Sequence, residues 1–223
     1  MEFSEVVRRR RMLRQYDPDR PVPPEVLAAC LDNAVRAPSA GFSQGWDFVV
    51  LTSDEERAQF WAATTDPDDD RSVDPHRDGW LRGLMSAPAL VLCLSHKQAY
   101  LDRYAEPDKG WADRDESRWP VPFWDIDTGM ASLLILLTAV DHGLGGLFFG
   151  VPPEYHADVH EQFAIPDDRT VIGVVSLGYA VPGQPRRRSP SLTRHRRTGD
   201  EVAHWGRFGV PASRVSGPHG GGR

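Results

Sequence analysis

The stretch at residues 127–150, DTGMASLLILLTAVDHGLGGLFFG, decides the fold of this 223-residue chain. Asp127 or Thr128 is a typical N-cap residue, and the apolar run after it predicts a helix that stops at a glycine-rich turn, residues 142–146. Apolar side chains occupy every face of this helix, which is typical of a helix buried on all sides. A short strand, residues 147–149, is predicted to follow the turn.

A helix with this pattern needs partners on every face, and two arrangements supply them. The helix can lie in the core of a monomer, or it can pack against a second subunit, and its residues leave both open. Its apolar run of about ten residues is shorter than a bilayer requires. We therefore predict no membrane partner.

The composition argues against two broad classes of protein. A formal net charge of -6 disfavours a nucleic-acid partner, although arginines cluster at residues 8–14 and 186–197 and could converge on one anion. The N-terminal sequence lacks the apolar segment of a signal peptide, so we predict a cytoplasmic protein. Cys30 and Cys93 lie in apolar segments and are predicted to be buried free thiols.

The rest of the chain alternates helices and strands, which indicates an α+β or α/β fold. We expect one domain over residues 1–209 and a disordered tail over residues 210–223. Ser53 and Glu56 have the spacing of a capping box. Strands are predicted at residues 47–51, 89–94 and 170–179, and helices at residues 2–11, from Pro24, and at 53–64, 79–85 and 153–163.

Residues 96–125 are the least regular part of the chain. Trp111, Trp119, Phe123 and Trp124 stand there among charges and prolines. A long loop inside a compact domain usually has a function, and aromatic residues argue against disorder. We predict a lid or pocket wall; the alternative is a surface excursion whose tryptophans pack on the body of the protein.

The polar residues disfavour hydrolytic and metal chemistry. No serine lies in a nucleophile elbow, no cysteine has an activating partner, and the sequence contains no P-loop or closed zinc site. His156 and His160 are four residues apart but lack the glutamate of the zincin pattern, so no metal site is predicted. The remaining option is a site in which a bound cofactor supplies the chemistry.

Four motifs, in the right order, resemble the FMN-dependent nitroreductase family. Residues 10–17, RRMLRQYD, are similar to its RRSxRxY/F-D opening, and residues 37–46, APSAGFSQGW, to its APSxxNSQPW loop. Residues 127–150 resemble its central helix, GLG turn and following strand. Gly178-Tyr179 and the basic run up to Trp205 resemble its closing GY…R…HW.

This resemblance, which covers residues 5–208, implies both a fold and an assembly. The fold would be a three-layer α/β/α arrangement with a central, mostly antiparallel sheet. The chain would form a domain-entwined homodimer, with the apolar helix as the dimer core and two FMN molecules at the interface. No side chain would be catalytic itself, because FMN carries the chemistry.

The resemblance also assigns residues to the flavin and to the substrate pocket. Arg10, with Arg194 and Arg196, would hold the phosphate, and Arg14 would lie beside the pyrimidine edge of the ring. The residues expected to contact FMN are Arg10, Arg11, Met12, Arg14, Pro38, Ser39, Ala40, Ser43, Phe149, Gly150, Arg194 and Arg196. Pro38, Ser39 and Ala40 would come from the other protomer, and a backbone N–H near Phe149 and Gly150 would reach N5. The pocket would be lined by Phe42, Trp111, Trp119, Phe123 and Trp124.

Three positions depart from the family pattern. Met12 stands where serine is common, Phe42 where asparagine is common, and Gly45 where proline is usual. The first two changes remove a hydroxyl contact and a hydrogen bond to the ring. These departures bear on the affinity and the potential of the flavin.

The resemblance implies hydride transfer from NADH or NADPH, through N5 of FMN, to an acceptor. The acceptor would be a nitroaromatic, a quinone or an activated alkene, and a deazaflavin is another donor to consider. Two alternatives remain: a flavin-dependent dehydrogenase of a specialised metabolite, and a non-catalytic flavin-binding or storage dimer. Met12 and Phe42 motivate the second.

Overall fold

The computed structural model describes residues 1–65, 75–182 and 194–211. The chain divides into two units, Met1–Pro182 and Gly183–Arg223. The helices of the first unit are α1 (Phe3–Arg9), α2 (Pro24–Ala34), α3 (Asp54–Ala63), α4 (Pro75–Met85), α5 (Lys97–Ala105), α6 (Phe123–Asp141) and α7 (His156–Gln162). Short 3₁₀ turns lie at Ala40–Phe42, Glu116–Arg118 and Pro153–Tyr155.

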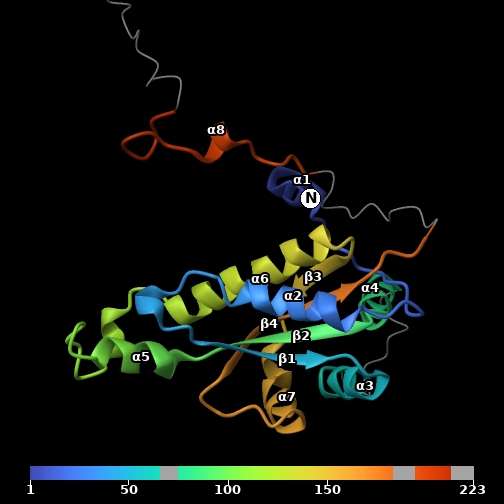
Figure 1. The fold of residues 1–223 in the computed structure, drawn as a ribbon, viewed down its shortest axis with the longest axis horizontal. Coiled ribbons are helices and arrows are strands. Elements are labelled where there is room, and N and C mark those ends of the chain that lie inside the picture. Colours follow the sequence, from blue (N-terminus) through green and yellow to red (C-terminus); the bar gives the residue numbers. More distant parts are fainter. Residues whose placement is uncertain (66–74, 183–193, 212–223) are drawn as a thin grey trace, which may run out of the picture. The chain divides into compact units, whose positions relative to one another are not determined.

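A four-stranded sheet lies at the centre of the first unit, with the strand order β1-β2-β4-β3 (Figure 1). Its strands are β1 (Trp46–Leu51), β2 (Ala89–Ser95), β3 (Gly145–Phe149) and β4 (Thr170–Gly178). Every neighbouring pair is antiparallel. The predicted strands and the antiparallel sheet are therefore confirmed.

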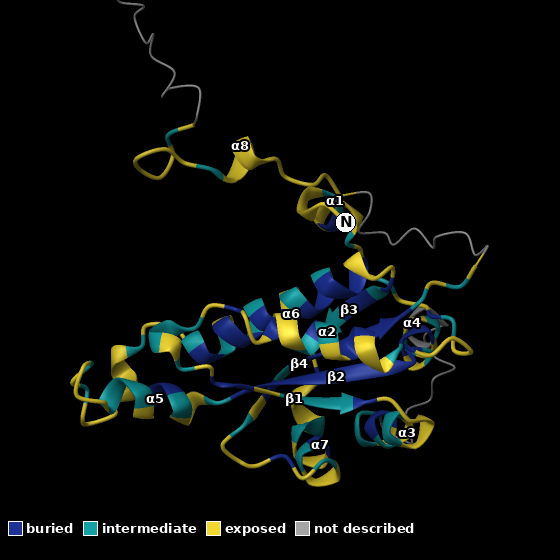
Figure 2. Ribbon diagram, viewed as in Figure 1, coloured by how far each residue is buried: buried dark blue, intermediate teal, exposed yellow. Residues whose placement is uncertain are grey.

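Helices cover both faces of the sheet. Successive side chains along a strand point to opposite faces, and in β2 the side chains of both faces are buried. Val91 and Cys93 pack in one buried cluster with residues of α2 and α6. Leu90 and Leu92 pack in another with residues of α3, α4 and α7. Figure 2 shows β2 buried along its length, and Figure 1 shows α2 and α6 on one side of the sheet with α3 and α7 on the other. The predicted three-layer arrangement is confirmed.

The central helix α6 begins a turn earlier than predicted. Its N-cap is Pro122, and Asp127 and Thr128 are buried helix residues, so the predicted cap is wrong. The residues that extend the helix include Trp124, which packs in an aromatic cluster. The Thr128 hydroxyl donates to the Trp124 carbonyl within the helix at 2.7 Å, as threonines in helices do.

The length of α6 also overturns the argument that its apolar run is too short for a bilayer. By length and composition alone its 19 residues, with a hydropathy of 1.5, could cross a membrane. However, 56% of that window is buried inside the protein. A core helix that packs against a sheet and another helix passes the same test.

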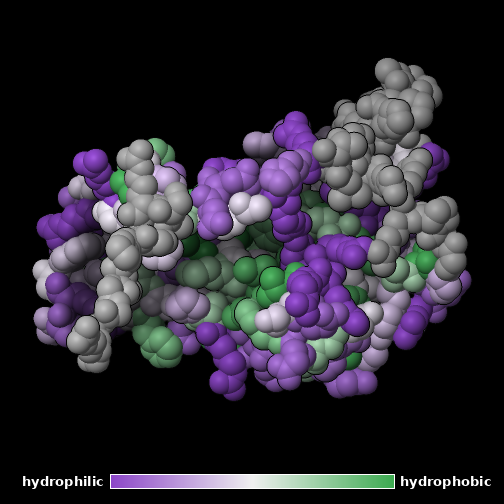
Figure 3. Space-filling view, turned by 90° about the horizontal axis from the view of Figure 1, so that it is seen from above, coloured by the Kyte–Doolittle hydropathy of each residue, from purple (hydrophilic) through white to green (hydrophobic). Residues whose placement is uncertain are grey.

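The described residues leave one face of α6 uncovered, so the prediction that it is buried on all sides is wrong for the described part of a single protomer. Ile126 and Leu133 are 43% and 47% exposed. Met130 and Leu137 are partly buried. We call these four residues the α6 stripe, because spacings of three and four place them on one helix face. Figure 3 shows hydrophobic atoms gathered in the middle of the face that looks upward in Figure 1.

The segment at residues 96–125 is more regular than predicted. It contains the helix α5, and its last residues belong to α6. Tyr100 and Leu101 of α5 are buried. The helix was missed because its apolar residues are few and stand among charged ones.

Both cysteines are buried free thiols, as predicted. Burial raises the pKa of Cys30 and of Cys93 to about 12. At pH 8 only about one thiol in ten thousand would be ionised.

We therefore expect the native protein to release no thionitrobenzoate from Ellman's reagent at pH 8 over minutes. The same protein in guanidinium chloride should release two equivalents, one for each cysteine in the sequence. A fast native reaction would contradict the packing of α2 and β2 described above.

The described part of the second unit is short. It contains α8 (Gly199–Val202), which begins with a capping box formed by Thr198 and Glu201. Arg194 and Arg196 precede this helix, and both are exposed.

Candidate functional site

The arginine segment, residues 10–14, runs beside the edge strand β3. Met12 forms an isolated parallel bridge with Gly146. The Leu13 amide donates to the Gly146 carbonyl at 3.1 Å. The segment therefore extends the sheet beyond β3, and it carries its arginines along that edge.

Tyr16 fixes the far end of this segment. Its hydroxyl donates to the Leu13 carbonyl at 2.8 Å and lies 2.7 Å from the Ser176 hydroxyl oxygen. Its amide donates to the Ser86 hydroxyl oxygen at 2.9 Å. Burial raises the pKa of the Tyr16 hydroxyl, so the group stays protonated and neutral at physiological pH.

Gly83 of α4 packs directly against the same segment. A Cβ at this position would stand 2.1 Å from the Arg14 carbonyl oxygen, where no atom fits. Glycine is therefore required there for the close approach of the two backbones.

The arginines divide into paired and unpaired groups. Arg8 and Arg9 contact the Glu5 carboxylate at 2.7 and 2.5 Å, and their hydrogen bonds hold its pKa below the usual value. Arg10, Arg11 and Arg14 form no ion pair with the residues that the structure describes. These three guanidinium groups are therefore available to an anion from outside the described chain.

The end of β3 is open at Gly150, while the Phe149 side chain packs against another aromatic ring. The Phe149 ring stacks on Trp61 with centroids 5.9 Å apart and an interplanar angle of 10°. Gly150 is exposed, and a Cβ there would meet nothing within 4 Å. Any ligand contact at this end of the strand would therefore be made by main-chain groups.

The loop at residues 38–45 is held by its own hydroxyls and by α6. The Ser43 hydroxyl donates to the Ala40 carbonyl at 2.7 Å, and the Ser39 hydroxyl oxygen accepts from the Gln44 amide at 3.0 Å. The Ala40 amide donates to the buried Asp127 carboxylate at 2.8 Å. This arrangement leaves Pro38 exposed and Phe42 75% exposed.

The loop and the arginine segment are separate within one protomer. Across the described residues, no hydrogen bond or ion pair links residues 38–43 to residues 10–14. One chain therefore brings together only part of the predicted flavin site, namely the arginine segment and β3.

Four predicted pocket residues meet in one aromatic cluster. The Trp119 ring lies 5.6 to 6.0 Å, centroid to centroid, from Trp111, Phe123 and Trp124. Tyr100 and Tyr104 of α5 complete the cluster at 6.0 and 4.6 Å from Trp119. The rings pack on one another, whereas Phe42 stands alone on its exposed loop.

Arg194 and Arg196 lie in the second unit. Their role beside Arg10 at a phosphate stays a prediction.

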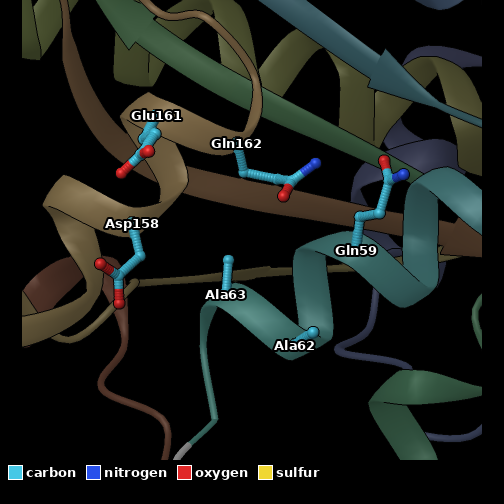
Figure 4. A pocket seen from close by; sticks show the side chains of 6 residues that line it. All are labelled: Gln59, Ala62, Ala63, Asp158, Glu161 and Gln162. Carbon is cyan, nitrogen blue, oxygen red and sulfur yellow. The ribbon is translucent and has the colours of Figure 1, made fainter.

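A surface hollow of about 620 Å³ lies between α3 and α7 (Figure 4). None of the predicted site residues lines it. Its lining consists of Gln59, Ala62 and Ala63 from α3 and Asp158, Glu161 and Gln162 from α7. Nearby, the Nε2 atom of His156 lies 3.1 Å from the Val151 carbonyl oxygen. Among the described residues, no three potential metal-binding side chains form a group.

The sequence reasoning missed several residues that shape this site. Tyr16 and Gly83 set the position of the arginine segment, and Asp127, Tyr100 and Arg103 hold the loop. The one available signal was Asp127, one of three aspartates in a largely apolar helix, since a buried charge usually has hydrogen-bond partners.

Comparisons with known proteins agree with this geometry. The model of the nitroreductase family matches residues 7–179. A protein of Archaeoglobus fulgidus named "Putative NADH dehydrogenase/NAD(P)H nitroreductase" is 31% identical over 180 residues, which are 80% of this chain and 85% of that protein. The 4-nitrobenzoate reductase of Nocardioides sp. is 30% identical over 202 residues, with 79% and 80% of the two chains covered.

Solved structures give the same fold. A "putative nitroreductase in complex with FMN" from Exiguobacterium sibiricum superposes with a TM-score of 0.61 at 23% identity and covers 86% of this chain and 95% of its own. At this identity the likeness establishes the fold. Because the family model spans most of the chain and two relatives at 30% and 31% identity span about four fifths of it, the chain belongs to the nitroreductase family of flavin-dependent NAD(P)H oxidoreductases.

Proposed function

We propose that this chain is a homodimeric FMN enzyme that passes hydride from NADH or NADPH to a nitroaromatic, a quinone or an activated alkene in the cytoplasm. Residues 1–209 would act as one domain in each protomer. The observation that carries the proposal is the unpaired arginine segment along the edge strand β3, which ends at the open position Gly150. Bound FMN would supply the atom that accepts and donates hydride.

The residues present fit a flavin phosphate. Arg10, Arg11 and Arg14 have no carboxylate partner in the described chain, whereas Arg8 and Arg9 share the single carboxylate of Glu5. Guanidinium groups bind phosphate oxygens in a bidentate manner. We assign Arg10 to the phosphate, together with Arg194 and Arg196, and Arg14 to the pyrimidine edge, where its charge would favour the reduced ring.

The main chain at the end of β3 would bind the ring itself. The Phe149 ring packs on Trp61, so we expect the contacts at Phe149 and Gly150 to come from the main chain. The open space beside Gly150 allows a flat ligand to approach the strand closely. We assign to this backbone the N–H that reaches N5, and to Arg11 and Met12 further contacts along the same edge.

A second protomer would complete the site. Because residues 38–43 are not joined to the arginine segment in one chain, we assign Pro38, Ser39, Ala40 and Ser43 to the flavin of the partner. The α6 stripe supports this assembly, since a lone chain leaves Ile126 and Leu133 substantially exposed. A two-fold interface would bury the same stripe from both protomers. Phe42 and the aromatic cluster would then face the acceptor.

The test is the visible spectrum of the purified protein under anaerobic conditions. We expect a yellow protein that bleaches on addition of NADPH or NADH and regains its colour when 1,4-benzoquinone is added. A yellow protein that neither nicotinamide bleaches would favour a dehydrogenase that regenerates its flavin with oxygen, or a storage dimer. A colourless protein that takes up no added FMN would contradict the proposal.

A further inference from the structure

The loop at residues 39–45 has left-handed backbone conformations, which are unfavourable for two of its residues. Gly41, Phe42 and Gln44 have φ angles of 61°, 60° and 52°. Phenylalanine and glutamine rarely adopt this left-handed region, because the Cβ atom approaches the main chain. Such conformations persist where the surrounding structure fixes them, so the contacts that hold this loop are informative.

One face of α5 supplies several of these contacts. Tyr100, Arg103 and Tyr104 lie on that face, because residues three and four apart are neighbours on a helix. The Arg103 Nε donates to the Gly41 carbonyl at 2.9 Å, and its two terminal nitrogens donate to the Asp108 carboxylate at 2.7 and 2.8 Å. A Cβ at Gly41 would stand 2.6 Å from the Tyr104 ring. The loop is thus seated against α5.

Asp127 of α6 links the loop to Tyr100 of α5 through two hydrogen bonds. Its Oδ2 atom accepts from the Ala40 amide at 2.8 Å and from the Tyr100 hydroxyl at 2.9 Å. Asp127 is 2% exposed, and no cationic side chain in the described chain pairs with it. Burial and the charge of Asp127 raise the pKa of Tyr100, so its hydroxyl remains a donor.

Gly45 belongs to the same contact. A Cβ there would stand 2.5 Å from the Tyr100 ring and 2.8 Å from the His96 carbonyl oxygen. Gly45 stands where the family usually has proline, and the position of the Tyr100 ring leaves no room there for a side chain. The whole arrangement leaves Phe42 75% exposed at the tip, on a backbone that is fixed at both sides.

We propose that Tyr100, Arg103 and Asp127 are positioning residues that hold Phe42 at a fixed place, where its ring selects electron acceptors by size. This inference rests on the proposed function, in which the loop lies at the partner's flavin. A ring on a rigid loop discriminates between acceptors, whereas a ring on a mobile loop would adapt to each of them. The segment at residues 96–118 would therefore act as a fixed support for the loop.

The test compares two arginines of the same segment. Arg103→Met removes the hydrogen bond to Gly41, and Arg114→Met is the matched control, because Arg114 contacts Asp102 at 2.6 Å and not the loop. We would measure kcat/KM for menadione and for 1,4-benzoquinone, and the rate of flavin reduction by NADPH in a stopped-flow instrument. Arg103→Met should change the ratio of the two kcat/KM values about 10-fold. Arg114→Met should keep both the wild-type ratio and the wild-type rate of flavin reduction.

A double variant shows whether Arg103 acts through Phe42. Phe42→Ala should change the ratio by itself, and adding Arg103→Met should then change it little further, because the positioned ring is gone. Tyr100→Phe, which keeps the ring and loses only the donor to Asp127, should change the ratio in the same direction as Arg103→Met. It is the second variant if Arg103→Met folds poorly.

Two results would overturn the inference while leaving the proposed function intact. One is a wild-type ratio in both Arg103→Met and Tyr100→Phe. The other is a change by Arg103→Met that is equally large in the presence of Phe42→Ala. A wild-type protein that binds no FMN would overturn the proposed function, and this inference with it.

Discussion

Replacing Leu133 by aspartate is expected to separate the dimer into monomers that remain folded. In a single protomer Leu133 is 47% exposed, so the substitution should change the free energy of unfolding by only about 0.5 kcal/mol. In the proposed dimer the α6 stripes of two protomers face each other, and each new carboxylate would be buried without a partner. Burial of an unpaired charge costs several kcal/mol. The dissociation constant of the dimer should therefore rise at least about 100-fold.

Sedimentation equilibrium at micromolar protein would measure this change, and the flavin content would be read on the same samples. The variant should also lose FMN, because the site is completed by the partner's loop. Leu133→Ala is the matched control: it shortens the side chain without adding charge and should remain a dimer with bound flavin. If Leu133→Asp sediments as the wild type does and keeps its flavin, the α6 stripe is not the subunit interface.

Gly83→Ala is expected to destabilise the protein and to weaken flavin binding together. In an open helix, alanine for glycine is favourable by about 1 kcal/mol. At this position the new Cβ would stand 2.1 Å from the Arg14 carbonyl oxygen, so the backbone of α4 or of the arginine segment must move. Overpacking of this kind costs about 1–3 kcal/mol, which reverses the sign of the helix preference.

Movement of the arginine segment should also lower the affinity for FMN about 10- to 100-fold, because a shift of about 1 Å is enough to spoil a positioned contact. Urea denaturation and a fluorescence titration with FMN would measure the two effects. Met85→Ala in the same helix is the control, since Met85 is exposed and should change stability by at most about 0.5 kcal/mol. A Gly83→Ala protein that is more stable than the wild type and binds FMN equally well would contradict the role assigned to this glycine.

The sequence carried enough local information to predict most of the fold. Strands such as β2, with its apolar run, and helices with explicit caps, such as the Ser53–Glu56 capping box of α3, were predicted almost at their observed bounds. The family motifs then gave the layer arrangement, because each motif sits at a defined place in that fold. These features depend on residues close together in the chain, which is why sequence patterns reveal them.

The helix α5 was not predicted, because its few apolar residues stand among charged ones. The beginning of α6 was not predicted either, and it has a tertiary cause. Trp124 extends α6 because it packs in the aromatic cluster. Asp127 looked like a cap, yet its carboxylate accepts from the loop and from Tyr100. A capping residue and a buried acceptor have the same local pattern, and only their distant partners distinguish them.

By itself, the sequence determined which segments form strands and helices, which motifs carry the arginines, and that a cofactor supplies the chemistry. Only the tertiary structure decided how those parts are positioned. In the folded chain the Phe149 ring packs against Trp61, which turns it away from the open end of β3, and Gly45 lies against the Tyr100 ring. It also leaves the α6 stripe exposed in a single protomer. The physical reason is that burial and close contact depend on residues far apart in the chain, which local sequence patterns do not record.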